Sequence, residues 1–122
     1  MSKRELPQIV TDLQAVRDRL TPLGAWIQGS YGPAVGPNCI MGAIYIVTGH
    51  VENGELRLAN PSFRAMHLER AMRHTIEELD DGRIVYGGSV VSFNDITSHK
   101  AVLDMIDRTI EHEKQEAGYV QT

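Results

Sequence analysis

The sequence predicts a mainly α protein, a single four-helix domain with glycine-rich loops between the helices. Its 122 residues fit one domain that can bury a sizeable core. Four segments carry apolar residues at helical spacing, and glycine and proline gather between them. We expect the domain to cover residues 1–122, with frayed ends at residues 1–5 and 118–122.

The first predicted helix covers residues 7–20, P-Q-I-V-T-D-L-Q-A-V-R-D-R-L. Val10, Leu13 and Leu20 fall on one apolar stripe, and Pro7 suits a first-turn position. Residues 24–38 follow, and their four glycines and two prolines predict an irregular loop.

Residues 39–47, C-I-M-G-A-I-Y-I-V, predict a buried central helix with Asn38 as its N-cap and Gly49 at its end. The β-branched residues in this segment leave a strand as the alternative. The segment is apolar almost all round, so a lone domain of this size could leave part of it uncovered. That observation raises the hypothesis of a homo-oligomer.

The later elements follow in order. The Asn-Gly pair within residues 50–58 is typical of a short hairpin, although the segment can equally be only a loop. Residues 62–79 predict the third helix, beginning at Ser62. Residues 83–95 are expected to be mostly extended, with a break at two glycines, and residues 98–115 predict the last helix.

Composition excludes several classes of function. Twelve Lys and Arg against sixteen Asp and Glu give a net charge of −4, which argues against direct nucleic-acid binding. Cys39 is the only cysteine, so a disulfide framework and a multi-cysteine zinc site are excluded. The longest apolar stretch is too short to span a bilayer, and no secretory signal is present at the N-terminus. We expect a cytoplasmic protein with no cofactor and no membrane partner.

A set of aromatic and amide residues in irregular segments is the main candidate for a ligand site, because pockets usually combine apolar walls with a few polar groups. The alternative is that the aromatic rings only close the ends of the helix bundle. The glycine-rich loop before residue 39 can also bind an anion, which Arg73, Arg83 or Arg108 would meet. The predicted ligand-binding residues are Trp26, Gln28, Tyr31, Phe93, Asn94, Asp95 and Arg108.

Asn94 and Asp95 stand just before the last predicted helix. They fit a structural turn or helix cap, and they fit the polar end of a ligand pocket. Thr97 or Ser98 is the better N-cap, which leaves the pair free for another role. On the ligand hypothesis, substitution of Asn94 or Asp95 by alanine should abolish binding and leave the melting temperature nearly unchanged.

Cys39 is the one candidate nucleophile. A helix N-terminus beside it would lower the thiol pKa, and His99 or His50 could act as base with Asp95 as orienter. The alternative, a buried structural cysteine, fits its apolar neighbours better. No metal site is expected, because the histidines form no recognised ligand motif.

The segments W-I-Q-G-S-Y-G, N-C-I-M-G-A-I and V-S-F-N-D-I-T resemble the motifs of a small uncharacterised family of bacterial and phage proteins. Those motifs are Trp-x-x-Gly, Cys-x-x-Gly-Ala and Trp-Asn-Asp. Phe93 departs from the pattern, since the family has Trp there. The resemblance implies a mostly helical domain and no particular reaction. Its motif residues in this chain are Trp26, Gly29, Cys39, Gly42, Ala43, Asn94 and Asp95.

These observations favour a non-enzymatic protein that binds a small, nucleotide-like ligand or a protein partner. In the phage setting that the resemblance implies, it would be a counter-defence or accessory protein that acts on a host protein or signal. The alternatives are a hydrolase or transferase that depends on Cys39, and an interaction module that works by oligomerising.

Overall fold

The structure is a computed structural model that describes residues 6–83 and 85–118. The predicted fraying of the two ends lies outside the described residues, apart from Gly118. Within the described residues the chain forms five helices and one two-stranded sheet. The elements are α1 (Gln8–Leu20), α2 (Ile40–Val47), β1 (Val51–Glu52), β2 (Glu55–Leu56), α3 (Phe63–Asp80), α4 (Val90–Ile96) and α5 (His99–Glu116).

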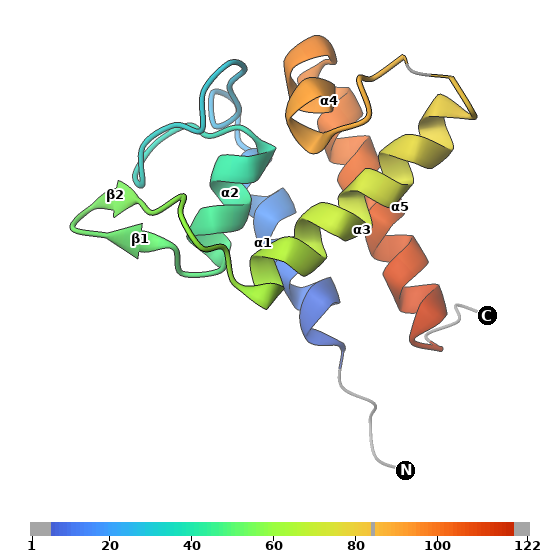
Figure 1. The fold of residues 1–122 in the computed structure, drawn as a ribbon, viewed down its shortest axis with the longest axis horizontal. Helices are drawn as coiled ribbons and strands as arrows, with labels where there is room; N and C mark the ends of the chain where they lie inside the picture. The colour runs from blue at the N-terminus through green and yellow to red at the C-terminus, as the bar shows by residue number, and fades with distance from the viewer. Residues whose placement is uncertain (1–5, 84, 119–122) are drawn as a thin grey trace.

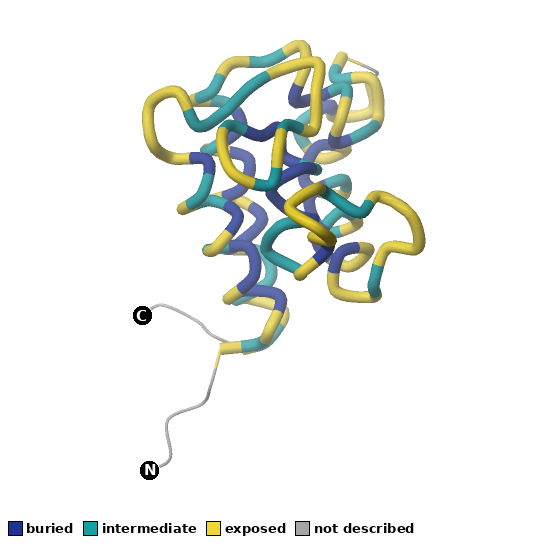
Figure 2. Tube along the Cα trace, turned by 90° about the vertical axis from the view of Figure 1, so that its left-hand side faces the viewer, coloured by how far each residue is buried: buried dark blue, intermediate teal, exposed yellow. Residues whose placement is uncertain are grey.

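The three long helices form the body of the fold. Helix α3 crosses in front of α1 and α5, while α2 and α4 stand at one end of this layer (Figure 1). Exposed residues gather in the loops, and buried residues line the inner faces of the helices (Figure 2). Each of the three long helices contributes to the core. Its residues from these helices include Val10, Leu13, Leu20, Leu68, Met72, Ile76, Val102, Met105 and Ile106.

The first, third and last predicted helices are confirmed. Their apolar stripes are buried, as the helical spacing predicted. Ser62 and Ser98 are the N-caps of α3 and α5, and each hydroxyl accepts from a backbone N–H three residues on. The last helix therefore begins without help from Asn94 or Asp95.

Helix α2 is confirmed as a buried helix, but its N-cap was predicted wrongly. Cys39, rather than Asn38, occupies the N-cap position, and its Sγ accepts from the backbone N–H of Gly42. Helices α1, α3 and α4 all pack on α2 within the same chain. Ile40, Gly42, Ala43, Ile44 and Tyr45 are buried there, whereas Met41, Ile46 and Val47 are half-buried, and the homo-oligomer stays a prediction. Among the residues that the structure describes, no helix is both long and apolar enough to cross a bilayer.

The count of four helices is wrong, because residues predicted to be extended form helix α4. The two β-branched residues at its start, Val90 and Val91, gave the segment a strand-like appearance. The helix begins because the hydroxyl of Ser89 accepts from the backbone N–H of Ser92 at 3.0 Å. Burial of Phe93 against the core then outweighs the local β preference.

The predicted hairpin is confirmed as a short one. Val51 pairs with Leu56 and Glu52 with Glu55 in antiparallel register. The turn residues Asn53 and Gly54 both have positive φ, 52° and 78°, which an Asn-Gly pair tolerates better than other residues.

His50 joins the end of α2 to the start of α3 through both ring nitrogens. Its Nε2 accepts from the backbone N–H of Ser62 at 3.0 Å, and its Nδ1 lies 2.8 Å from the hydroxyl of Thr48. The residue is 1% exposed. Burial lowers the pKa of His50, and the charge of Arg57 lowers it further. The ring is therefore neutral in the fold, because a protonated Nε2 could not accept from Ser62.

This geometry predicts that His50 makes the protein less stable in mild acid. The unfolded chain binds a proton at His50 as the pH falls through about 6.5, while the folded chain resists it. The free energy of unfolding should therefore fall below that pH, by at most about 1.4 kcal/mol per pH unit from this group. Urea unfolding at pH 7.5 and 5.5 measures the effect. Between these two pH values, the free energy of unfolding should fall less for His50→Gln, which cannot titrate, than for the wild-type chain. An equal fall in both chains would show that His50 is not responsible.

Candidate functional site

Asn94 is the centre of a hydrogen-bond network between the loop 21–38 and helices α2 and α4. Its side-chain oxygen Oδ1 accepts from Nε1 of Trp26 at 2.7 Å and from the backbone N–H of Ile40 at 3.1 Å. Its Nδ2 donates to the carbonyl of Ile27 at 3.0 Å and to Oδ1 of Asp95 at 3.1 Å. The residue is 0% exposed, so all of these bonds form away from water.

The Ile40 bond gives Asn94 a helix-capping role that the sequence could not show. Ile40 is the first residue of α2, where backbone N–H groups have no partner inside the helix. Asn94 therefore caps the N-terminus of a helix 54 positions away in the sequence, instead of the helix that follows it. The prediction that it caps a helix is correct in kind and wrong about which helix.

Gln28 and Asp95 extend this network toward the surface. Nε2 of Gln28 donates to the carbonyls of Asn94 and Thr97, at 3.2 and 2.9 Å, and so satisfies the C-terminal end of α4. Oδ1 of Asp95 accepts from the backbone N–H of Gly29 at 2.8 Å. We call Trp26, Gln28, Asn94 and Asp95 together the Asn94 junction.

The half-buried ring of Trp26 also has a stacking partner. Its ring stacks on His99 with a centroid distance of 5.5 Å and an interplanar angle of 4°. Nε2 of His99 in turn donates to the carbonyl of Leu20 at 2.6 Å. The Asn94 junction therefore joins α2 and α4 to the loop 21–38, and through His99 it also reaches α1 and α5. Both polar atoms of the Asn94 side chain are bonded within the chain, whereas Gln28 and Asp95 are exposed.

The other predicted ligand-binding residues lie away from the junction. Tyr31 sits in the loop, 39% exposed, with its ring edge-on to Tyr45 at 6.2 Å. Phe93 belongs to the core and packs edge-on against Tyr86. Arg108 lies on α5, where Nε donates to Glu78 of α3 at 2.7 Å. The seven predicted residues therefore form no single site, although four of them meet at the junction.

The side chain of Asn38 fixes the conformation of the glycine-rich loop through three hydrogen bonds. Its Nδ2 donates to the carbonyls of Tyr31 and Pro33, at 2.8 and 2.9 Å, and its Oδ1 accepts from Nε of Arg19 at 2.9 Å. At the start of α2, the backbone N–H groups of Ile40 and Gly42 are already bonded. An anion at this helix N-terminus would have to displace those bonds.

Cys39 does not have the surroundings of a nucleophile. It is 5% exposed, and burial raises the pKa of its thiol, with Gly42 N–H opposing the effect. The predicted lowering of this pKa is wrong, because burial outweighs the helix N-terminus. Neither predicted base is directed at Cys39. Nδ1 of His50 contacts Thr48 and its Nε2 contacts Ser62, while Nε2 of His99 is bonded to the carbonyl of Leu20. The geometry gives the hypothesis of a Cys39 enzyme no support. Among residues 6–83 and 85–118, no three His, Cys, Asp or Glu side chains are grouped to hold a metal ion.

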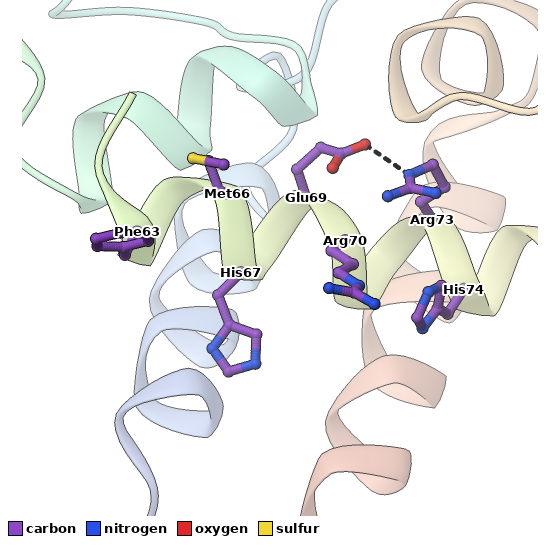
Figure 3. A pocket seen from close by; sticks show the side chains of 7 residues that line it. All are labelled: Phe63, Met66, His67, Glu69, Arg70, Arg73 and His74. Carbon is purple, nitrogen blue, oxygen red and sulfur yellow. Dashed lines mark hydrogen bonds and ion pairs between the residues drawn. The ribbon is translucent and has the colours of Figure 1, made fainter. Parts of the chain in front are cut away.

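A surface groove of about 730 Å³ follows the outer side of α3, which sequence reasoning overlooked. Phe63 stands 89% exposed at its start, and Met66 is 51% exposed. Figure 3 shows the lining side chains projecting from one helix, with Arg73 joined to Glu69 by a 3.1 Å bond. We call the lining residues the α3 face: Phe63, Met66, His67, Glu69, Arg70, Arg73 and His74. The available signal was that Phe63 and Met66 fall outside the buried stripe of the helix.

Residues 5–112 match a family model described as a family of unknown function, DUF6197. The chain belongs to this family. The DUF6197 match contains the whole Asn94 junction and the whole α3 face. No curated protein and no solved structure matches the chain. The resemblance to an uncharacterised family is therefore confirmed, while its bacterial and phage setting stays a prediction.

Proposed function

We propose that this protein is a binding protein that docks an acidic, amphipathic helix of a partner protein on its α3 face. The observation that carries the proposal is an almost fully exposed phenylalanine, Phe63, on the same face of α3 as the positively charged Arg70 (Figure 3). Phe, Met and Arg are enriched in protein interfaces, and Met66 lies on the same face as Phe63 and Arg70.

The shape of the α3 face favours a protein partner over a small molecule. All of its lining residues belong to one helix, so the groove has no opposing wall. Small-molecule sites usually bury 70–90% of the ligand, roughly, and need walls on several sides. A helix of another protein can instead lie along α3 and supply the missing wall.

The charges on the α3 face favour an acidic partner. Arg70 is exposed and forms no hydrogen bond or ion pair with any described residue. Arg73 is shared between Glu69 and Glu77, at 3.1 and 3.6 Å. Because Arg73 is already paired with these two glutamates, the unpaired positive charge on the α3 face is that of Arg70.

In the phage setting implied by the resemblance, the docked helix would belong to a host protein. This proposal keeps the protein-partner half of the function predicted from sequence. The small-ligand half has no support at Asn94, whose side chain is buried and already bonded within the chain.

A synthetic helical peptide tests the proposal. We expect a labelled 16-residue peptide with a leucine stripe flanked by glutamate to bind, with a Kd of about 10–100 µM by fluorescence anisotropy. Phe63→Ala and Arg70→Glu should each weaken binding about tenfold and leave the melting temperature unchanged, because both side chains are exposed. Binding should also weaken as salt is raised.

Matched controls make the result specific. Leu23→Ala removes a fully exposed apolar side chain outside the α3 face, and Arg83→Glu makes the same charge change elsewhere. Both should bind the peptide as the wild-type chain does. Equal affinity for the same peptide with lysine in place of glutamate would contradict the proposal, and so would full binding by Phe63→Ala.

A further inference from the structure

A second groove lies where α3, α4 and α5 meet, and it shares no lining residue with the α3 face. Its volume is about 240 Å³. Phe93 and Met105, which are 2% and 1% exposed, form an apolar floor with Leu79. We call it the Phe93 groove, and its lining residues are Leu79, Tyr86, Phe93, Ala101, Asp104, Met105 and Arg108.

The walls of the Phe93 groove suit an aromatic ring. Tyr86 stands edge-on to Phe93 with ring centroids 5.0 Å apart. A ligand ring in the groove could therefore pack against two aromatic side chains. Unlike the α3 face, the groove has walls from three helices and from the segment that carries Tyr86. Its volume lies below the roughly 300–1,000 Å³ of drug-sized sites, which limits the occupant to about one ring with a short side chain.

The charged groups at the rim of the Phe93 groove favour a negatively charged ligand. Arg108 uses Nε for Glu78, and its other four N–H groups have no hydrogen-bond partner among the described residues. Asp104, the one acidic side chain in the lining, is already held by Nζ of Lys100 at 2.5 Å. The free donors at the rim therefore belong to a cation, and guanidinium groups pair well with carboxylates.

We infer that the Phe93 groove binds a small aromatic monocarboxylate, with the ring on Phe93 and Met105 and the carboxylate on Arg108. This site is independent of the proposed docking function, because none of its residues belongs to the α3 face. It places two of the sequence-predicted ligand residues, Phe93 and Arg108, in one site without the Asn94 junction.

Methyl NMR of the full chain with ¹³C-labelled methionine tests this inference. Phenylacetate should shift the methyl signal of Met105 with a Kd of about 1 mM and leave Met66, on the α3 face, unmoved. Phenylacetamide and phenethylamine, which keep the ring and lose the negative charge, should bind about tenfold more weakly.

Two substitutions at the rim give the matched comparison. Arg108→Gln should remove the preference for phenylacetate over phenylacetamide, and Asp104→Asn should strengthen phenylacetate binding about twofold. Both residues are exposed, so both variants should fold. An unmoved Met105 signal at 10 mM phenylacetate, at roughly ten times the expected Kd, would overturn the inference. Equal or tighter binding of phenethylamine would also overturn it, because Asp104 would then govern the site.

Discussion

Asn94→Ala should be among the most damaging single substitutions in this protein. It removes the groups that pair with Trp26 Nε1, the Ile40 N–H and the Ile27 carbonyl, all in a region with little access to water. Each buried polar group left without a partner costs about 1–3 kcal/mol. Because these costs are not additive, we expect a loss of about 3–5 kcal/mol in the free energy of unfolding. The melting temperature should fall by about 10–25 °C in thermal unfolding followed by circular dichroism.

Asp95→Ala is the matched control, because Asp95 is exposed and neighbours Asn94 in the sequence. It loses the bonds from the Gly29 N–H and from Nδ2 of Asn94, both near the surface, and should cost only about 1 kcal/mol. The ligand hypothesis drawn from the sequence expects both variants to melt nearly as the wild-type chain does. A melting temperature of Asn94→Ala within about 3 °C of wild type, a shift worth less than about 1 kcal/mol, would contradict the structural role.

Gly42→Ala should also destabilise the fold, although alanine favours helices by about 0.5–1 kcal/mol over glycine. A Cβ atom at Gly42 would lie 2.0 Å from the backbone oxygen of Tyr31 and 3.2 Å from Cβ of Asn38. The obstacle is the backbone of the loop, so it cannot move aside as a flexible side chain would. We expect a loss of about 3 kcal/mol, measured by urea unfolding.

The sign of that change separates the two effects. Ala15→Gly, on the exposed side of α1, measures helix preference alone and should cost up to about 1 kcal/mol. If close packing at Gly42 outweighs helix preference, Gly42→Ala and Ala15→Gly both destabilise the chain, although one replaces glycine by alanine and the other alanine by glycine. A more stable Gly42→Ala variant would show that the loop does not lie against α2 as described.

Regular helices were the part of this fold that the sequence predicted best. The apolar spacing within α1, α3 and α5 identifies the buried side of each helix without information from the rest of the chain. The serine caps at Ser62 and Ser98 act on residues only three positions away, so they too are visible locally.

Helix α4 and the role of Asn94 could not be predicted in the same way. A two-valine start indicates a strand locally, and only the burial of Phe93 in the assembled core favours a helix. Asn94 bonds to residues 54 to 68 positions away, so its partners depend on how the loop and helices pack. Four of the seven residues that were grouped from the sequence do meet, but their residue types cannot distinguish a ligand site from an internal network.

The α3 face illustrates a different limit. An apolar residue on the polar side of a helix is visible in the sequence, but single exposed apolar residues are common and carry little information. The solvent exposure of Phe63 and the lack of a partner for Arg70 become known only when neighbouring helices are in place. Those two facts, rather than the motif residues, support the proposed function.

An amide chemical-shift titration with the glutamate–leucine peptide shows whether the α3 face or the Asn94 junction is the binding surface. In ¹H–¹⁵N spectra of the labelled chain, we expect the largest shifts at residues 63–74 of α3. The amides of Gln28, Gly29 and Asp95 should remain unmoved, because the Asn94 junction is an internal support and no binding surface. Shifts concentrated at the junction, with α3 unchanged, would contradict docking on the α3 face and would place the binding site where the sequence predicted it.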